Sequence, residues 1–374
     1  MTGPRFPRPD RVVVKVGSSS LRDRAGGLDR DLVADLVAQI VAVSGKGTEV
    51  VLVSSGAVAA GLRPLGLLRR PTDLPGLQAA ASVGQGILVH TYQQSFAVHG
   101  MVCGQVLLTP GDIVQRARYL NARQTFEKLL ELGAVPIVNE NDTVATDELR
   151  FGDNDRLAAL AASMLGADVL VLLSDVDGLL DGDPSEVADL PVLGRVDDLS
   201  SLDPRLFGGT GSDVGSGGMA SKLEAVRIAT FSAAHAVIAN ARRPGVVREV
   251  VAGAHVGTWF PPSSRRPESR KLWIAFATAP QGSVVVDEGA VKALVDGNKS
   301  LLAAGVVAAD GDFAPGDPVD VVGPDRRVVA RGLVSYGRAD VERLLGRSTA
   351  AVTAELGAAY ARALIHRDSL VVVV

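Results

Sequence analysis

Two lysines lie in contexts that are typical of phosphate contacts. Lys15 stands inside the apolar run VVVKVG, where an ammonium group without a partner would be costly to bury. Lys222 ends the glycine-dense segment GGTGSDVGSGGMASK, residues 208–222, and begins a helical stretch. Glycines let backbone N–H groups approach an anion and a helix N-terminus favours negative charge, so this segment fits a phosphate. It lacks the GxxxxGK[ST] spacing of a P-loop, and a mobile surface loop is the other interpretation.

Polar segments follow successive apolar runs, at the points where the strands of a sheet would end. They are SSGA at 54–57, NEND at 139–142 and SD at 174–175, and GDND at 152–155 opens a helix. Each of these segments by itself is typical of a turn or a helix cap. Together they indicate a binding site, because an open α/β sheet binds ligands at the carboxyl ends of its strands.

The residue types favour group transfer over hydrolysis or redox chemistry. The five histidines are scattered without metal-ligand spacing, and the motifs GxSxG and HExxH do not occur. The chain shows no obvious general base, but a carboxylate acceptor has a pKa of about 4.3 and is already deprotonated at neutral pH. A kinase that acts on a carboxylate therefore needs positioning and charge neutralisation, and no base.

Apolar, β-branched runs alternate with helical patterns and predict the elements that would position these residues. The predicted strands are residues 12–16, 50–53, 102–108, 135–138, 169–173 and 236–239. Their uniformly apolar character is typical of strands that helices cover on both faces. We therefore predict an α/β fold, a three-layer αβα sandwich with a mostly parallel central sheet.

A change of composition predicts a domain boundary at residues 261–270, PPSSRRPESR, which have no apolar side chain to pack a core. Predicted helices follow near residues 289–296 and 339–345, among short strands at 272–276, 283–286, 306–309, 318–322, 327–334 and 370–374. This pattern predicts a small β-rich domain.

Composition and charge limit the class of protein. The 374 residues are 47% apolar, which is enough for two buried cores and excludes disorder as the main state. The net charge of −4 gives no bulk electrostatic case for nucleic acid or an anionic membrane, and a single cysteine, Cys103, excludes a disulfide-stapled fold. We expect a cytoplasmic location. Residues 74–111 carry no charged side chain, but glutamines and glycines interrupt them, so we expect buried core or a subunit interface there.

Seven segments occur in the order and at the separations of a known family: VVVKVGSSSL, VLVSSGAVAAG, LLTPGDI, YLNARQTF, PIVNENDTVAT, FGDNDRLAALAA and GSGGMASKLEA. In these segments the chain resembles the bacterial glutamate 5-kinases (gamma-glutamyl kinases) of the amino-acid kinase superfamily, and its C-terminal part is similar to the PUA domain. With the composition, this predicts a flexible N-terminal arm at 1–10, an amino-acid kinase domain at 11–260, a linker at 261–278 and a PUA-like domain at 279–374.

The resemblance implies ATP-dependent phosphorylation of the γ-carboxylate of L-glutamate to L-glutamyl 5-phosphate, the first step of proline biosynthesis. Proline would be a feedback inhibitor, and Mg²⁺ would accompany ATP as cofactor. Lys15, Lys222 and Asp155 would be catalytic. Glutamate would be bound by Ser55, Asp142 and Asn154. The ATP site would comprise Lys15, Ser174, Asp175, Ser216, Gly217, Gly218, Met219, Ala220, Ser221 and Lys222. No metal ligand is assigned. We expect a homo-oligomer, a dimer or tetramer, without membrane association.

Two alternatives stay open. One keeps the kinase fold but changes the acceptor, although SSGAVAAG and NENDTV offer no cation for an acceptor that already carries phosphate. The other is an RNA-binding or regulatory protein that acts through the PUA-like domain. That domain is not basic overall, but folding could gather Arg326, Arg327, Arg331 and Arg338 on one face, so RNA binding is the less favoured alternative.

Overall fold

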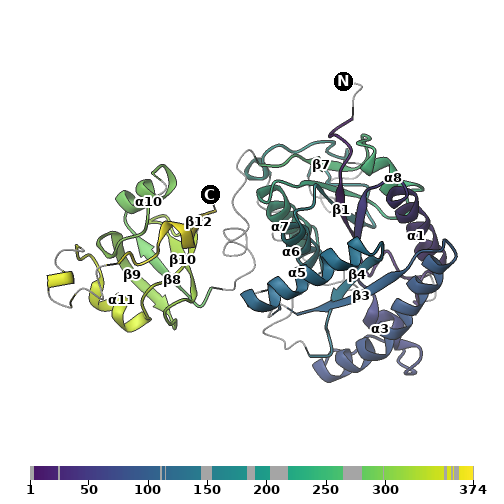
Figure 1. The fold of residues 1–374 in the computed structure, drawn as a ribbon, viewed down its shortest axis with the longest axis horizontal. Helices are drawn as coiled ribbons and strands as arrows, with labels where there is room; N and C mark the ends of the chain where they lie inside the picture. The colour runs from purple at the N-terminus through teal and green to yellow at the C-terminus, as the bar shows by residue number, and fades with distance from the viewer. Residues whose placement is uncertain are drawn as a thin grey trace. The chain divides into compact units, whose positions relative to one another are not determined.

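The chain divides into two compact units, residues 1–266 and 267–374, each described here by itself (Figure 1). The division falls within the predicted linker, residues 261–278. A computed structural model describes residues 4–23, 26–109, 112–113, 115–144, 154–182, 190–202, 218–263, 280–297, 299–348, 352–354, 357 and 362–373.

The first unit is built on a seven-stranded sheet in the order β3-β4-β2-β1-β5-β6-β7. Its strands are β1 (Arg11–Val16), β2 (Glu49–Ser54), β3 (Cys103–Leu108), β4 (Val135–Glu140), β5 (Val169–Ser174), β6 (His235–Asn240) and β7 (Thr258–Phe260). All neighbours pair in parallel except β6 and β7, which are antiparallel. The six predicted strands and the mostly parallel sheet are confirmed. The sequence did not predict β7, because three residues are too few to show a pattern.

Helices cover both faces of this sheet and make the predicted three layers (Figure 1). On one face lie α1 (Arg30–Ser44), α3 (Leu74–Ala97) and α8 (Val246–Val251), and on the other lie α5 (Arg116–Glu131), α6 (Asn154–Leu165) and α7 (Met219–Phe231). Val12, Val14 and Val16 of β1 belong to the core under α1 and α3. Since side chains alternate along a strand, Lys15 points to the opposite face, toward α6 and α7.

The charge-free segment 74–111 supplies α3 and β3, and its buried residues join the core as predicted. Asp73 caps α3, where its side chain accepts from Gly76 N. A short helix, α2 (Ala57–Leu62), crosses α3 at Gly61 and Gly84. A Cβ added to Gly84 would lie 1.8 Å from Ala57 O, so glycine is required for this close approach. No described helix is long and apolar enough to span a membrane.

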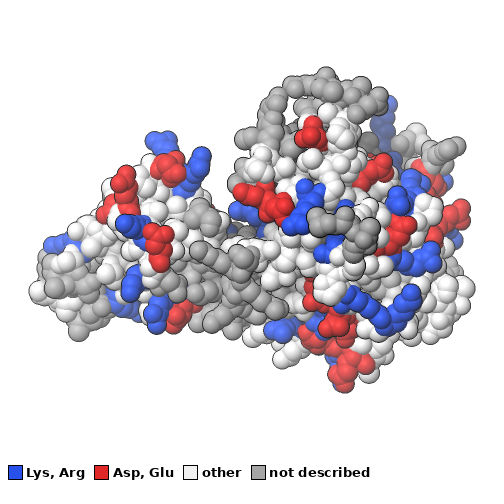
Figure 2. Space-filling model, turned by 90° about the horizontal axis from the view of Figure 1, so that it is seen from above, with Lys and Arg blue, Asp and Glu red and all other residues white. Residues whose placement is uncertain are grey.

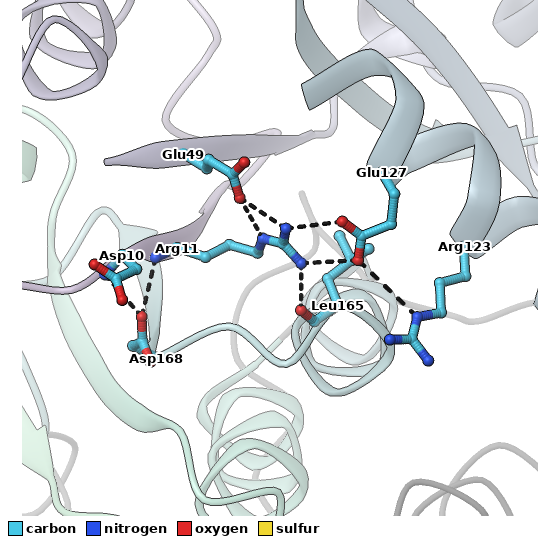
Figure 3. A network of polar contacts seen from close by, with 7 residues as sticks. All are labelled: Asp10, Arg11, Glu49, Arg123, Glu127, Leu165 and Asp168. Carbon is cyan, nitrogen blue, oxygen red and sulfur yellow. Dashed lines mark hydrogen bonds and ion pairs between the residues drawn. The ribbon is translucent and has the colours of Figure 1, made fainter. Parts of the chain in front are cut away.

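Arg11 joins the amino end of β1 to three other elements, as Figure 3 shows. Its guanidinium donates to both carboxylate oxygens of Glu127 on α5, at 3.0 and 2.9 Å, and to Glu49 of β2 at 2.7 Å. It also donates to the carbonyl oxygen of Leu165, the last residue of α6, at 2.5 Å. Arg11 therefore holds the end of α6 at the sheet edge opposite to the strand ends that carry the polar segments.

Residues 4–9 pack against the first unit, where the sequence predicted part of a flexible arm. Phe6 is 5% exposed, and its ring stacks on the imidazole ring of His235 in β6, with 4.7 Å between the ring centroids. The Arg5 guanidinium donates to the carbonyl oxygens of Val256, Gly194 and Gly257. The prediction was wrong for these residues. Their proline-rich composition is typical of a flexible arm, and the partners of the Phe6 ring lie more than 200 residues away in the sequence, so its burial has no local signal.

The second unit holds a five-stranded sheet in the order β12-β11-β10-β8-β9. Its strands are β8 (Gly282–Val286), β9 (Val306–Gly311), β10 (Pro318–Val322), β11 (Val328–Leu333) and β12 (Leu370–Val372), with α10 (Glu288–Val295) and α11 (Arg338–Leu344) beside them. A hydrophobic core of its own includes Val284, Val319 and Leu344. The predicted β-rich domain is confirmed, while the predicted strand at 272–276 lies outside the described residues.

Candidate active site

Lys15, Asp155 and Lys222 form a buried ionic cluster at the carboxyl end of the sheet. Lys15 comes from the end of β1, Asp155 from the first turn of α6 and Lys222 from the first turn of α7. Lys15 Nζ pairs with Asp155 Oδ1, and Lys222 Nζ lies 3.2 Å from Asp155 Oδ2. All three residues are buried: Lys15 is 3% exposed, Lys222 is 7% exposed and Asp155 is 0% exposed. The structure thus brings together the three residues that the sequence singled out as catalytic.

The cluster places two ammonium groups on one buried carboxylate. Lys15 and Lys222 contact different oxygens of Asp155, and all three side chains are removed from solvent. Two lysines side by side at the strand ends are suited to an anion with several charges, such as a polyphosphate. Gly17 leaves room beside Lys15, since an added Cβ would lie 3.7 Å from Lys15 Nζ.

A second, uncharged group of side chains lies beside this cluster. Asn154 precedes Asp155 at the start of α6, and its Nδ2 donates to Ser54 O at 3.1 Å, to Ser55 Oγ at 3.0 Å and to Asn139 Oδ1 at 2.8 Å. Gly56 has a φ of 102°, in the left-handed region, which turns the chain from β2 directly into α2 and leaves Ser55 at the sheet edge. Two of the three predicted glutamate residues, Ser55 and Asn154, are thus in contact.

The third predicted glutamate residue, Asp142, lies in the turn after β4, two residues beyond the end of that strand. Asp153, which the sequence placed beside Asp155, lies outside the described residues. Asn139 at the end of β4 was seen in the sequence only as part of the NEND segment. Gln85 of α3, which accepts from Asn139 Nδ2 at 2.8 Å, gave no sequence signal, because one amide on a long helix has no distinctive spacing.

The predicted nucleotide residues come from two elements that flank the cluster. Ser174 ends β5, is buried, and its hydroxyl donates to Asp175 Oδ1 at 3.1 Å. Gly218 caps α7 through its backbone without a side-chain hydrogen bond, and Met219, Ala220 and Ser221 form the first turn before Lys222. Ser216 and Gly217 lie outside the described residues. The described part of the segment therefore leads into a helix N-terminus, as the sequence predicted.

Comparisons with known proteins identify the family. The Amino acid kinase family is matched over residues 10–240, and the PUA domain over residues 282–356. The chain is 54% identical over 364 residues to the glutamate 5-kinase of Streptomyces coelicolor, covering 97% of this chain and 96% of the relative. It is 54% identical over 362 residues to the glutamate 5-kinase of Salinispora arenicola, covering 96% of this chain and 97% of that relative.

The chain therefore belongs to the amino acid kinase family, whose fold it shares. Within that family its similarity over nearly the whole length of these relatives places it among the glutamate 5-kinases.

Proposed function

We propose that this chain transfers the γ-phosphoryl group of ATP to the γ-carboxylate of L-glutamate, giving L-glutamyl 5-phosphate in the first step of proline biosynthesis. The observation that carries the proposal is the buried Lys15–Asp155–Lys222 cluster at the strand ends, with the amides and hydroxyls around Asn154 beside it. The curated relatives that match nearly the whole chain are named glutamate 5-kinase.

The chemistry needs charge neutralisation above all. An oxygen of the γ-carboxylate attacks the γ-phosphorus, and the bond to the departing ADP oxygen breaks with its electron pair. No proton has to be removed, because the acceptor is already ionised. The repulsion between the acceptor carboxylate and the triphosphate is offset by Lys15 and Lys222, while Asp155 holds both ammonium groups in place. These three residues are the catalytic residues of the proposal.

The remaining predicted site residues divide between the two substrates. Ser55, Asp142 and Asn154 would hold glutamate, since its ammonium requires a carboxylate or carbonyl acceptor and its carboxylates require donors. Ser174, Asp175 and residues 216–222 would line the nucleotide site. Of these, the described residues 174–175 and 218–222 lie at the end of β5 and at the start of α7, the helix that carries Lys222.

Mg²⁺ would enter with the nucleotide. Within the part of the chain that the structure describes, no group of three His, Cys, Asp or Glu side chains could hold a metal ion. Asp155 is already paired with two lysines. The ion would therefore be held mainly by phosphate oxygens and water, which is usual for Mg²⁺ at nucleotides.

Proline would act as a feedback inhibitor by competing with glutamate. Proline shares the α-carboxylate and the positively charged nitrogen of glutamate but lacks the γ-carboxylate. A site that recognises the α-amino acid part can therefore bind both. Inhibition that raises the KM for glutamate and leaves kcat unchanged would support a shared site.

A homo-oligomer would form through the outward face of α3. That face is free of charged side chains and includes Ala79, Ser82, Val83, Gly86 and His90. Val83 is 38% exposed. Because an interface between two identical copies buries the same residues twice, a face without charge avoids like-charge repulsion. Val83→Arg should lower the mass in solution, whereas Leu132→Arg, exposed on another surface, should not.

The decisive experiment is ATP turnover with magnesium across the twenty amino acids, with hydroxylamine to trap an acyl phosphate. Formation of product from L-glutamate would support the proposed reaction. Suppression of that product by proline would support feedback inhibition. Product from another acceptor would favour the other kinase interpretation. We also propose that the protein works in the cytoplasm, where ATP and glutamate are both available.

RNA binding through the second unit is the weaker candidate. Of the arginines that could form a basic face, Arg331 pairs with Asp320 at 2.7 Å, Arg338 with Glu342 at 2.6 Å and Arg327 with Asp325 at 3.7 Å. Figure 2 shows basic and acidic side chains interspersed over this unit, at the left of the view. Phosphate binding would have to compete with these carboxylates.

A further inference from the structure

Three side-chain amides form a chain that crosses the carboxyl edge of the sheet. Gln85 of α3 accepts from Asn139 Nδ2 at 2.8 Å, and Asn139 Oδ1, at the end of β4, accepts from Asn154 Nδ2 at 2.8 Å. α3 and α6 lie in opposite helical layers. The chain therefore ties the layer of α3 to the first residue of α6, beside the lysine cluster.

The direction of each amide is fixed by its partners. Ser54 O only accepts, so the nitrogen of Asn154 must face it, and the Glu140 backbone N–H only donates, so the oxygen of Asn139 must face that group. Asn139 Nδ2 is then directed away from Glu140 N, toward Gln85 Oε1. Gln85 supplies the acceptor that completes the hydrogen bonding of this largely buried amide.

This arrangement leaves two buried polar atoms of the chain of amides unused. Among the residues that the structure describes, the donor Gln85 Nε2 and the acceptor Asn154 Oδ1 are buried and make no hydrogen bond, and Asn154 Oδ1 is the one next to the lysine cluster. A buried polar atom without a partner is costly, so such an atom in a binding site indicates a ligand group. L-glutamate has one donor at neutral pH, its α-ammonium, because both carboxylates only accept.

We propose that Gln85 is a positioning residue that acts through Asn139 to hold Asn154 Oδ1 in place as the acceptor for the α-ammonium of glutamate. The inference rests on the proposed assignment of Asn154 to the glutamate site. Without the Gln85 acceptor, Asn139 Nδ2 is buried and unpaired, and Asn139 shifts to find a partner. Asn154 then loses a fixed neighbour, and its oxygen no longer meets the ammonium in the best geometry.

The test compares Gln85→Met with the wild type in the full chain, using L-glutamate as substrate and glutarate as competing inhibitor. Methionine keeps the length of the side chain but offers no comparable acceptor, and glutarate lacks the ammonium. Gln85→Met should raise the KM for L-glutamate about tenfold, as expected for a weakened hydrogen bond to a charged group. The kcat, the KM for ATP and the inhibition constant of glutarate should stay within about twofold, since only ground-state binding of one group changes.

Two further variants separate positioning from packing. Gln85→Glu keeps an acceptor oxygen whether the side chain is ionised or protonated, so its KM for L-glutamate should stay within about threefold of the wild type. Gln124→Met, at an exposed position of α5, should change nothing. If Gln85→Met lowers the stability of the protein, Gln85→Ala removes the same acceptor oxygen with the residue that has the highest helix propensity.

Three results would overturn the inference while the proposed function stands. They are an unchanged KM for L-glutamate in Gln85→Met, an equal loss of affinity for glutarate, and an equal rise of the KM in Gln85→Glu. A wild-type enzyme that does not phosphorylate L-glutamate would instead remove the proposed function itself.

Discussion

Among single residues, Asp155 is the one on which the charge of the site depends. It is 0% exposed and pairs with both Lys15 and Lys222. Asp155→Asn keeps the shape but removes the carboxylate that both buried ammonium groups contact. We expect kcat to fall about 100-fold or more, and the free energy of unfolding to fall by about 3–5 kcal/mol. Steady-state kinetics and urea unfolding would measure the two effects.

The matched control is Asp181→Asn, because Asp181 is an exposed aspartate that makes none of the described contacts of the cluster. It should leave both quantities unchanged. A fully active and stable Asp155→Asn enzyme would mean that the lysines do not need this carboxylate.

His235 makes the stability of the first unit depend on pH. Burial lowers the pKa of His235, which nearby Asp168 opposes in part, and its Nδ1 accepts from Trp259 Nε1 at 3.2 Å. The Trp259 ring is held between this histidine and the Arg195 guanidinium, whose Cζ lies 4.7 Å from the ring centroid. Because the folded state binds the proton less readily than the unfolded state, stability is full above the unfolded pKa of about 6.5 and falls as the pH drops toward the folded pKa.

His235→Gln keeps an acceptor for Trp259 but does not titrate. The free energy of unfolding of the wild type minus that of His235→Gln should therefore be larger at pH 8 than at pH 5.5. Urea titrations at both values measure it, and a constant difference would show that His235 does not titrate between them.

Among the secondary-structure elements, the crossing of α2 and α3 is the contact most sensitive to size. An added Cβ at Gly84 would lie 1.8 Å from Ala57 O and 2.5 Å from Gly61 N, so the helices would have to separate. Gly84→Ala should lower the free energy of unfolding by about 1–3 kcal/mol and reduce activity, because α2 follows Ser55 directly. Gly86→Ala, on the same helix with open space around its Cβ, should stabilise by up to about 1 kcal/mol. Thermal unfolding of both variants decides the comparison, and equal effects would contradict it.

The sequence predicted those elements whose signal is local. Uniformly apolar runs identified six strands of the first sheet, and the family resemblance of the motifs around Lys15, Asp155 and Lys222 brought these residues into one predicted site. Contacts between distant segments carry no such signal. Phe6 packs on His235, and Gln85 reaches Asn139 across 54 residues, so neither contact could be read from spacing.

For the whole molecule, each unit has a hydrophobic core of its own, and the described site residues all lie in the first. A chain truncated to residues 1–266 should therefore fold and phosphorylate L-glutamate with a kcat within about threefold of the full chain. Kinetics and a thermal melt of the truncated protein would test this. Loss of activity with a normal melt would mean that the second unit contributes to catalysis.

The hydrogen bonds of Arg11 limit the length of helix α6 that this fold can accommodate. β1 and α6 are joined at both of their ends, by Lys15 and Asp155 at one and by Arg11 and Leu165 at the other. One residue inserted into α6 adds about 1.5 Å and about 100° of rotation, so it cannot satisfy both joints at once. Homologous chains should therefore hold the spacing from Asp155 to Leu165 constant.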